Sequence, residues 1–120
     1  MLERMADIPA NVVGIRASGT VSADDYEEVL RPAIQGAIGS GEKIRLVYVL
    51  GPDFGGYSAG AAWEDLKLGT GYLRDWQRCA VVTDHEVLAG VIRGFGVLMP
   101  GEIRVFPVAE EAAAVAWAAA

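Results

Sequence analysis

The sequence has little of the chemistry on which most enzymes depend. Its 120 residues include a single cysteine, Cys79, and a single histidine, His85. One cysteine excludes a disulfide within the chain and a cysteine-based zinc site, and one histidine excludes a two-histidine metal motif. Few nucleophile–base pairs can be assembled from such a set. We therefore predict no metal, no cofactor and no enzymatic activity.

Positive charge is also scarce. Ten Lys and Arg residues stand against sixteen Asp and Glu, which gives a net charge of −6. The closest approach to a basic cluster is Lys43 with Arg45 on one expected strand. Nucleic acids and anionic membrane surfaces would be repelled by this mean charge, so we expect neither as a partner.

Long apolar runs are missing as well. No run approaches the roughly 20 residues that span a bilayer, and residues 1–10 carry Glu3, Arg4 and Asp7 in place of the apolar core of a signal peptide. We expect a cytoplasmic protein without stable membrane insertion.

What the sequence does contain is enough apolar mass for one domain over residues 1–120. Hydrophobic residues make up 52% of the chain and charged residues 22%, which excludes a disordered chain. Short runs rich in β-branched residues predict five strands: Leu2–Met5, Val12–Ala17, Ile44–Leu50, Cys79–Thr83 and Ile103–Phe106.

Apolar residues at helical spacing predict about four helices between and after these strands. They are a helix that begins at Ser22 and ends near Gly39, one over residues 59–74, one that opens with a capping box at Thr83–Glu86, and one over Glu110–Ala119. Pro32 should kink the first of them, because it lacks an N–H and crowds the carbonyl group of Glu28. The alternation predicts an α/β fold: a mixed five-stranded sheet with four parallel strands and one antiparallel edge strand.

Ligands of open α/β sheets bind beyond the carboxyl ends of the strands. Two connections qualify, Gly51–Ser58 and Thr83–Glu86, and the glycines of the first permit positive φ and close backbone approach. Neither a P-loop nor a dinucleotide fingerprint is present. The predicted ligand or partner surface consists of Asp53, Phe54, Gly55, Gly56, Tyr57, Ser58, Trp63 and Asp84. The alternatives are structural: a turn with Ser58 as a helix cap, an exposed cap at His85, and Cys79 as a small buried hydrophobe.

Several segments resemble the SpoIIAA-like bacterial family. They are VLGPDFGGYSAGAAWEDLKLG (49–69), VVTD (81–84) and FGVLMPGEIRVF (95–106), together with IRASG (15–19) and the DYEEVLRPA helix. The similarity covers nearly the whole chain. It implies the fold shared by STAS domains, which include anti-anti-sigma factors, and by the related lipid-binding Sec14/CRAL-TRIO proteins.

The resemblance also suggests a modification site. STAS anti-anti-sigma proteins carry a phosphorylatable serine in an Asp-Ser-Ser-Gly-like turn at the start of the second helix, where this chain has Tyr57-Ser58-Ala59-Gly60. Ser58 matches that place, although no aspartate directly precedes it. Ser58 is thus the candidate phosphoacceptor.

Two functions of different classes follow. The first is a non-enzymatic, STAS-like regulatory module that binds a protein partner through the surface around residues 51–63 and the loop after the third predicted helix. The second is a carrier or sensor for a small apolar or amphipathic ligand, in a pocket lined by Phe54, Tyr57, Trp63 and Leu66.

Self-association is a further expectation. Val97, Leu98 and Met99 are consecutive apolar residues that cannot all face one core. At least one should be exposed in a monomer, and a two-fold homodimer is the commonest way to cover such a patch.

Overall fold

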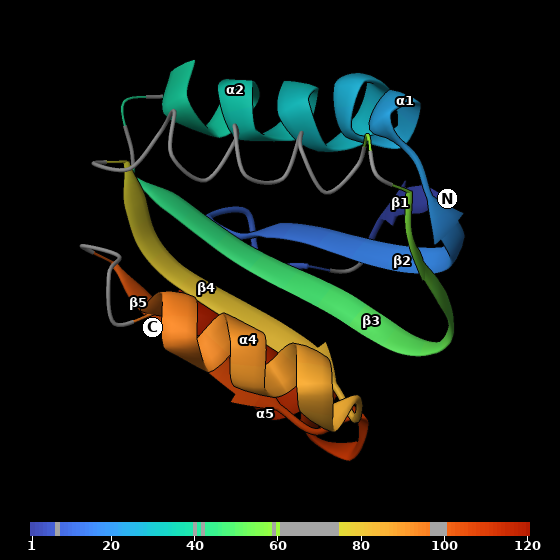
Figure 1. Ribbon diagram of the computed structural model, residues 1–120. Coiled ribbons are helices and arrows are strands. Elements are labelled where there is room, and N and C mark those ends of the chain that lie inside the picture. Colours follow the sequence, from blue (N-terminus) through green and yellow to red (C-terminus); the bar gives the residue numbers. More distant parts are fainter. Residues whose placement is uncertain (7, 40, 42, 59, 61–74, 97–100) are drawn as a thin grey trace.

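A mixed sheet of five strands, in the spatial order β1-β2-β3-β4-β5, runs through the computed structural model of the chain (Figure 1). The structure describes residues 1–6, 8–39, 41, 43–58, 60, 75–96 and 101–120. The strands are β1 Leu2–Arg4, β2 Val13–Val21, β3 Ile44–Tyr57, β4 Trp76–Thr83 and β5 Glu102–Phe106. β1 pairs antiparallel with β2 at the edge, and β2 to β5 are mutually parallel. The predicted α/β architecture and strand directions are confirmed.

Two strands continue well past their predicted carboxyl ends, and β4 begins at Trp76, three residues before its predicted start at Cys79. β2 continues from the predicted end at Ala17 to Val21, and β3 continues from Leu50 to Tyr57. The prediction of a loop over Gly51–Ser58 was therefore wrong for most of its length. Each extension supplies the other's backbone hydrogen-bond partners, and this pairing outweighs the low strand propensity of glycine and proline.

The helix between β2 and β3 has three parts, α1 Ala23–Asp25, the π-helical turn η1 Tyr26–Leu30 and α2 Arg31–Gly39. Ser22 and Asp25 form the predicted capping box: the Ser22 hydroxyl accepts from the Asp25 N–H at 3.3 Å and the Asp25 carboxylate accepts from the Ser22 N–H at 2.8 Å. The irregularity expected at Pro32 takes the form of the wide turn just before it, in which the Arg31 N–H reaches the Tyr26 carbonyl group.

α4 Glu86–Gly96 lies on the same face of the sheet, because Leu88 and Ile92 pack against the cluster that holds Leu30 and Ile34. Its cap differs from the prediction. Thr83 accepts from the N–H of His85, and the His85 imidazole Nδ1 accepts from the N–H of Leu88 at 3.3 Å. His85, and not Thr83, is the cap of α4.

The turn η2 Val108–Glu110 and α5 Glu111–Ala119 follow β5, and α5 covers the opposite face. Figure 1 shows α4 in front of the sheet and α5 behind it. Ala114 and Ala118 are fully buried against Val47, Val49 and Val82, and Val115 and Trp117 pack beside them. The central strand β3 is thus buried on both faces, as its almost continuous apolar run from Ile44 to Leu50 predicts.

Two expected features cannot be compared with the structure. The predicted helix over 59–74, which includes Trp63 and Leu66, lies outside the described residues apart from Gly60, and so do Val97, Leu98 and Met99. None of the helices in the described ranges is long and apolar enough to cross a membrane.

Candidate functional site

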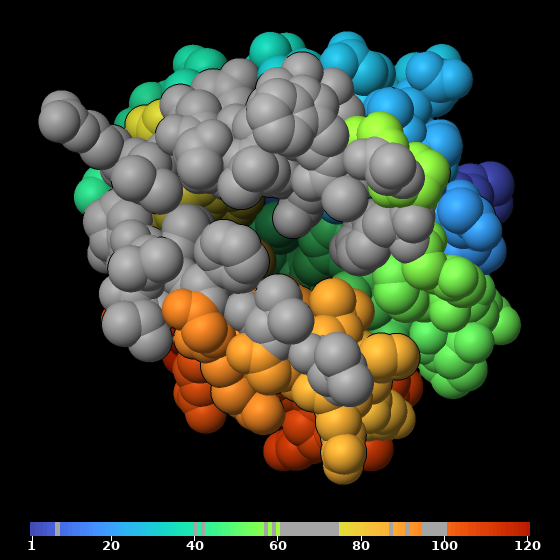
Figure 2. Space-filling model, in the orientation of Figure 1, coloured from blue at the N-terminus to red at the C-terminus, as the bar shows by residue number. Residues whose placement is uncertain are grey.

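The carboxyl end of β3 extends beyond the rest of the parallel sheet. Its last pair with β4 is Leu50 with Thr83, whereas its pairing with β2 continues to Tyr57. We call residues 18–21 of β2 and 51–57 of β3 the β2–β3 arm. On the side of β3 away from β2, no strand of the described chain pairs with this segment. In Figure 2 the arm's green surface is exposed between the blue residues that begin α1 and the orange α4.

The arm is bent by extra residues in β3. Ala17 pairs with Leu50 and Gly19 with Phe54, so β2 advances two residues while β3 advances four. Such bulges bend a strand and increase its twist, and Figure 1 shows β3 curving upward there.

Glycine is favoured at two places in this bend. Gly56 has a φ of 115°, and a Cβ at Gly55 would lie 3.2 Å from both the carbonyl carbon and oxygen of Gly19. The positive φ and the close approach predicted from the sequence are both present, within a strand.

The described side chains of the predicted surface have different environments. Asp53 is exposed, whereas Phe54 is half-buried and packs against the core cluster under α2 and α4. Ser58 is half-buried, and its N–H donates to the Val21 carbonyl group at 2.9 Å, which ends the β2–β3 pairing. The structure thus places Asp53, Phe54, Gly55, Gly56 and Tyr57 on the arm and Ser58 directly after it.

Asp84 is committed elsewhere. Its carboxylate accepts from the Val108 N–H at 3.0 Å and so ties the end of β4 to the start of η2. The imidazole of His85 caps α4, so both of these neighbouring residues bind backbone N–H groups. Within the described ranges, no cluster of three or more His, Cys, Asp or Glu side chains could hold a metal ion.

Arginines form a group that the sequence did not reveal. On the α5 face Arg45 of β3 and Arg78 of β4 are direct neighbours in the sheet register, and Arg104 lies on the next strand. They are far apart along the chain, and only the strand register brings them together.

Two of these arginines bind the end of α5. Arg78 donates to the Trp117 carbonyl group at 2.7 Å, Arg45 to that of Ala118 at 2.8 Å, and Asn11 to that of Ala119 at 3.1 Å. Cations near a helix C-terminus interact favourably with its partial negative charge. Three consecutive carbonyl groups are satisfied in this way.

Two hollows open at the amino ends of the parallel strands, far along the strands from the arm. One has a volume of about 320 Å³ and is lined by Asn11, Lys43, Arg45 and Gln77. The second, of about 270 Å³, lies between the start of β2 and α2 and shares Asn11 and Lys43. Neither is the apolar pocket expected around Phe54, Tyr57, Trp63 and Leu66, which stays a prediction.

Comparison with known proteins agrees with this architecture. The model of the SpoIIAA-like family matches residues 12–119. Among solved structures, the chain is similar to an uncharacterized protein of the DUF3478 family, with a SpoIIAA-like fold, from Shewanella loihica PV-4. The two are 25% identical with a TM-score of 0.74, and the match covers 98% of this chain and 90% of that one. No curated protein matches. Because the family model matches nearly its whole length and the five-stranded mixed sheet agrees with it, the chain belongs to the SpoIIAA-like family.

Proposed function

We propose that this protein is a non-enzymatic interaction module that binds a protein partner through the β2–β3 arm. One observation carries the proposal. Beyond the last β3–β4 pair, the segment 51–57 of β3 pairs with β2 on one side, and no strand of the described chain pairs with it on the other. Where no strand of the described chain pairs with one edge of a strand, that edge can accept a segment of another chain by backbone hydrogen bonding.

The composition of the arm favours a selective partner. Pro52 removes one backbone donor from the edge, and Asp53 places an exposed charge there. Both features oppose indiscriminate strand pairing between molecules. A partner would therefore need a complementary basic side chain near Asp53 in addition to an extended backbone.

Ser58 would regulate this surface if it is phosphorylated. A phosphate would add nearly two negative charges at the end of the arm, close in sequence to Asp53. We expect it to strengthen the binding of a partner that recognises Asp53 through a basic group, because the added negative charge attracts the same group. If Ser58→Asp and Ser58→Ala both leave partner affinity unchanged, Ser58 has only a structural role.

Site-specific photo-crosslinking tests the location of the surface. A photoreactive amino acid at position 53 should capture the same protein repeatedly from cells of the host. The matched control is position 28, because Glu28 is an exposed acidic residue on η1. Capture of that protein equally well from position 28, or of none from position 53, would contradict the proposal.

Self-association is a second role that the sequence favours. The consecutive apolar residues Val97, Leu98 and Met99 predict a homodimer contact. Sedimentation of the wild type and of the Leu98→Glu/Met99→Glu variant tests it. A dimeric wild type and a monomeric variant are expected, and a wild type that is monomeric at high micromolar concentration would exclude the dimer.

A further inference from the structure

The hollows at the amino end of the sheet concentrate positive charge in an acidic protein. Lys43 and Arg45 line the larger one, and Arg4 and Lys43 line the smaller one. Among the described residues, no carboxylate lines either hollow. No described carboxylate forms an ion pair within 4 Å with Arg4, Lys43 or Arg45. The chain as a whole carries a net charge of −6, so this grouping is local and opposite in sign to the mean.

The remaining lining residues add hydrogen-bond donors. Asn11 and Gln77 each carry an amide group, and both side chains are exposed at the hollow. A guanidinium, an ammonium and two amides together present donors in several directions, as the oxygens of a phosphate group require.

An irregularity in the sheet accounts for the position of Gln77. Ile44 pairs with Trp76 but Arg45 pairs with Arg78, so Gln77 is an extra residue of β4. A bulge of this kind redirects a side chain and is often found next to binding sites. Here it lies beside Arg45, at the rim of the larger hollow.

Arg45 connects this hollow to the rest of the fold. Its one hydrogen bond with the described chain goes to the Ala118 carbonyl group at 2.8 Å, which leaves most of its five N–H donors for another acceptor. This bond also fixes the guanidinium in place before any ligand arrives, and a fixed donor loses less freedom on binding.

We propose that the larger hollow binds the phosphate group of a small phosphorylated metabolite or of inorganic pyrophosphate. Its volume of about 320 Å³ suits a small ligand, since such sites usually begin near 300 Å³. A long polyanion such as a nucleic acid would meet the negative charge of the remaining surface, so a small free anion is the occupant.

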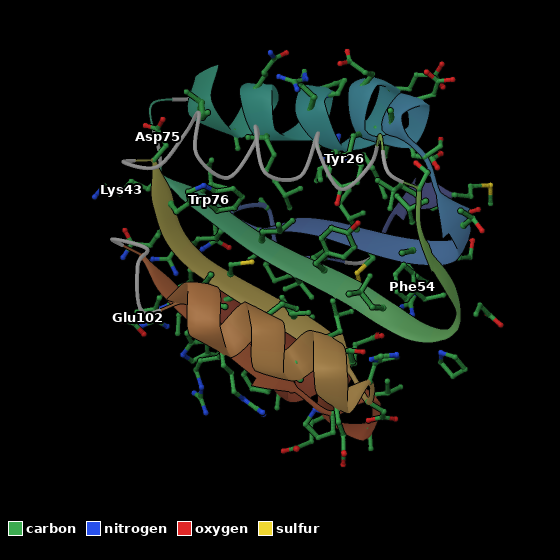
Figure 3. All side chains as sticks on the ribbon, in the orientation of Figure 1. Tyr26, Lys43, Phe54, Asp75, Trp76 and Glu102 are labelled. Atoms are coloured by element: carbon green, nitrogen blue, oxygen red, sulfur yellow. The ribbon has the colours of Figure 1, made fainter. Side chains whose placement is uncertain are left out.

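Two acidic residues of the described chain lie at the same end of the sheet and do not line this hollow (Figure 3). Figure 3 shows Asp75 and Glu102 at the same end of the sheet as Lys43. Neither carboxylate forms an ion pair with the described cations. Their negative charges disfavour an anion close to them, but they do not neutralise the cations of the hollow.

The test measures pyrophosphate binding by calorimetry at fixed ionic strength. Lys43→Gln and Gln77→Glu change the lining of the hollow, while Arg93→Gln alters an exposed residue of α4. All three variants have the same net charge, one unit more negative than the wild type. Arg45 is left unchanged because it also holds α5. Matching thermal unfolding midpoints would establish that the variants are folded.

We expect Lys43→Gln and Gln77→Glu each to weaken pyrophosphate binding about tenfold, in line with the loss of a charge-assisted contact. Arg93→Gln should change it less than twofold. If a phosphate ester is the natural ligand, adenosine monophosphate should compete with pyrophosphate for the same site. Binding of pyrophosphate without competition by adenosine monophosphate would assign the inorganic anion. No binding by the wild type at millimolar concentration, equal effects of all three variants, or equal competition by malonate would overturn the proposal.

Discussion

Arg78 holds Trp117 in two ways at once. Its Nη1 donates to the Trp117 carbonyl group at 2.7 Å, and its Cζ lies 5.1 Å from the centroid of the Trp117 ring. Arg104 lies 5.4 Å from the same ring. The end of α5 is therefore fixed to β4 and β5 by planar cations that serve both a carbonyl group and an aromatic face.

Replacement of Arg78 by lysine should loosen α5 although the charge is retained. A lysine cannot both reach the carbonyl group and stack its head group on the indole ring, so we expect unfolding to become easier by about 1–2 kcal/mol. Urea unfolding followed by circular dichroism measures the loss, and hydrogen exchange should locate it at residues 115–120. The control is Arg93→Lys on α4, which should have almost no effect; equal stability of the two variants would show that the Arg78 geometry is unimportant.

The cap of α4 gives a second prediction. His85 accepts from the Leu88 N–H through Nδ1, and asparagine can supply an equivalent acceptor at a helix cap. His85→Ala should cost about 1 kcal/mol of unfolding free energy, and His85→Asn should restore most of it. Denaturant unfolding measures both. If the alanine variant is as stable as the asparagine variant, the imidazole is not a cap.

Asp25 should make stability depend on pH in the acidic range. Burial raises the pKa of Asp25. The hydrogen bonds from the Ser22 N–H and hydroxyl and the charge of the Met1 amino group, 3.5 Å away, together outweigh burial, so the pKa lies below its ordinary value. A carboxyl group whose pKa is lower in the folded state stabilises the fold above its unfolded pKa, near 4, and this stability is lost as the pH falls toward the folded pKa.

The wild type should therefore exceed Asp25→Asn in stability at pH 7, and the difference should shrink between about pH 4.5 and pH 3. Thermal unfolding at a series of pH values measures it. The control is Asp24→Asn, in the same turn but exposed. A difference between wild type and Asp25→Asn that stays constant with pH would show that the capping carboxylate is not the cause.

The bend of the arm predicts opposite effects of the same substitution at two glycines. Gly55→Ala would bring a Cβ within 3.2 Å of the Gly19 backbone, whereas an added Cβ at Gly36 of α2 meets nothing within 4 Å. We expect Gly55→Ala to destabilise by about 1 kcal/mol and Gly36→Ala to stabilise by roughly 0.5–1 kcal/mol. Stabilisation by both would mean that the two strands of the arm are not in close contact.

The helix and sheet layers of this fold could be predicted from the sequence because the signals for their strands and helices are local. The β-branched runs, the Ser22 capping box and the apolar run of β3 all carry their signal within a few residues. The continuation of β3 to Tyr57 does not, because glycine and proline disfavour a strand and, among the described strands, the pairing there is with β2.

The arginine group was missed for a similar reason. Arg45, Arg78 and Arg104 become neighbours only through the register of three strands. Of the candidate site, the sequence located the arm, and its alternative of an exposed cap at His85 is confirmed. The carboxylate of Asp84 accepts from the Val108 N–H, and a partner of that kind depends on where a distant segment, the start of η2, comes to lie.

The affinity of the purified, cross-linked partner for two charge-reversal variants tests the central claim most directly. Asp53→Lys and Glu28→Lys change the net charge equally and lie at exposed positions, one on the arm and one on η1. If the arm is the binding surface, Asp53→Lys should raise Kd at least about tenfold, the effect of one lost charge-assisted contact, and Glu28→Lys should change it less than twofold. Equal values of Kd for the two variants would contradict the assignment of the arm as the interaction surface.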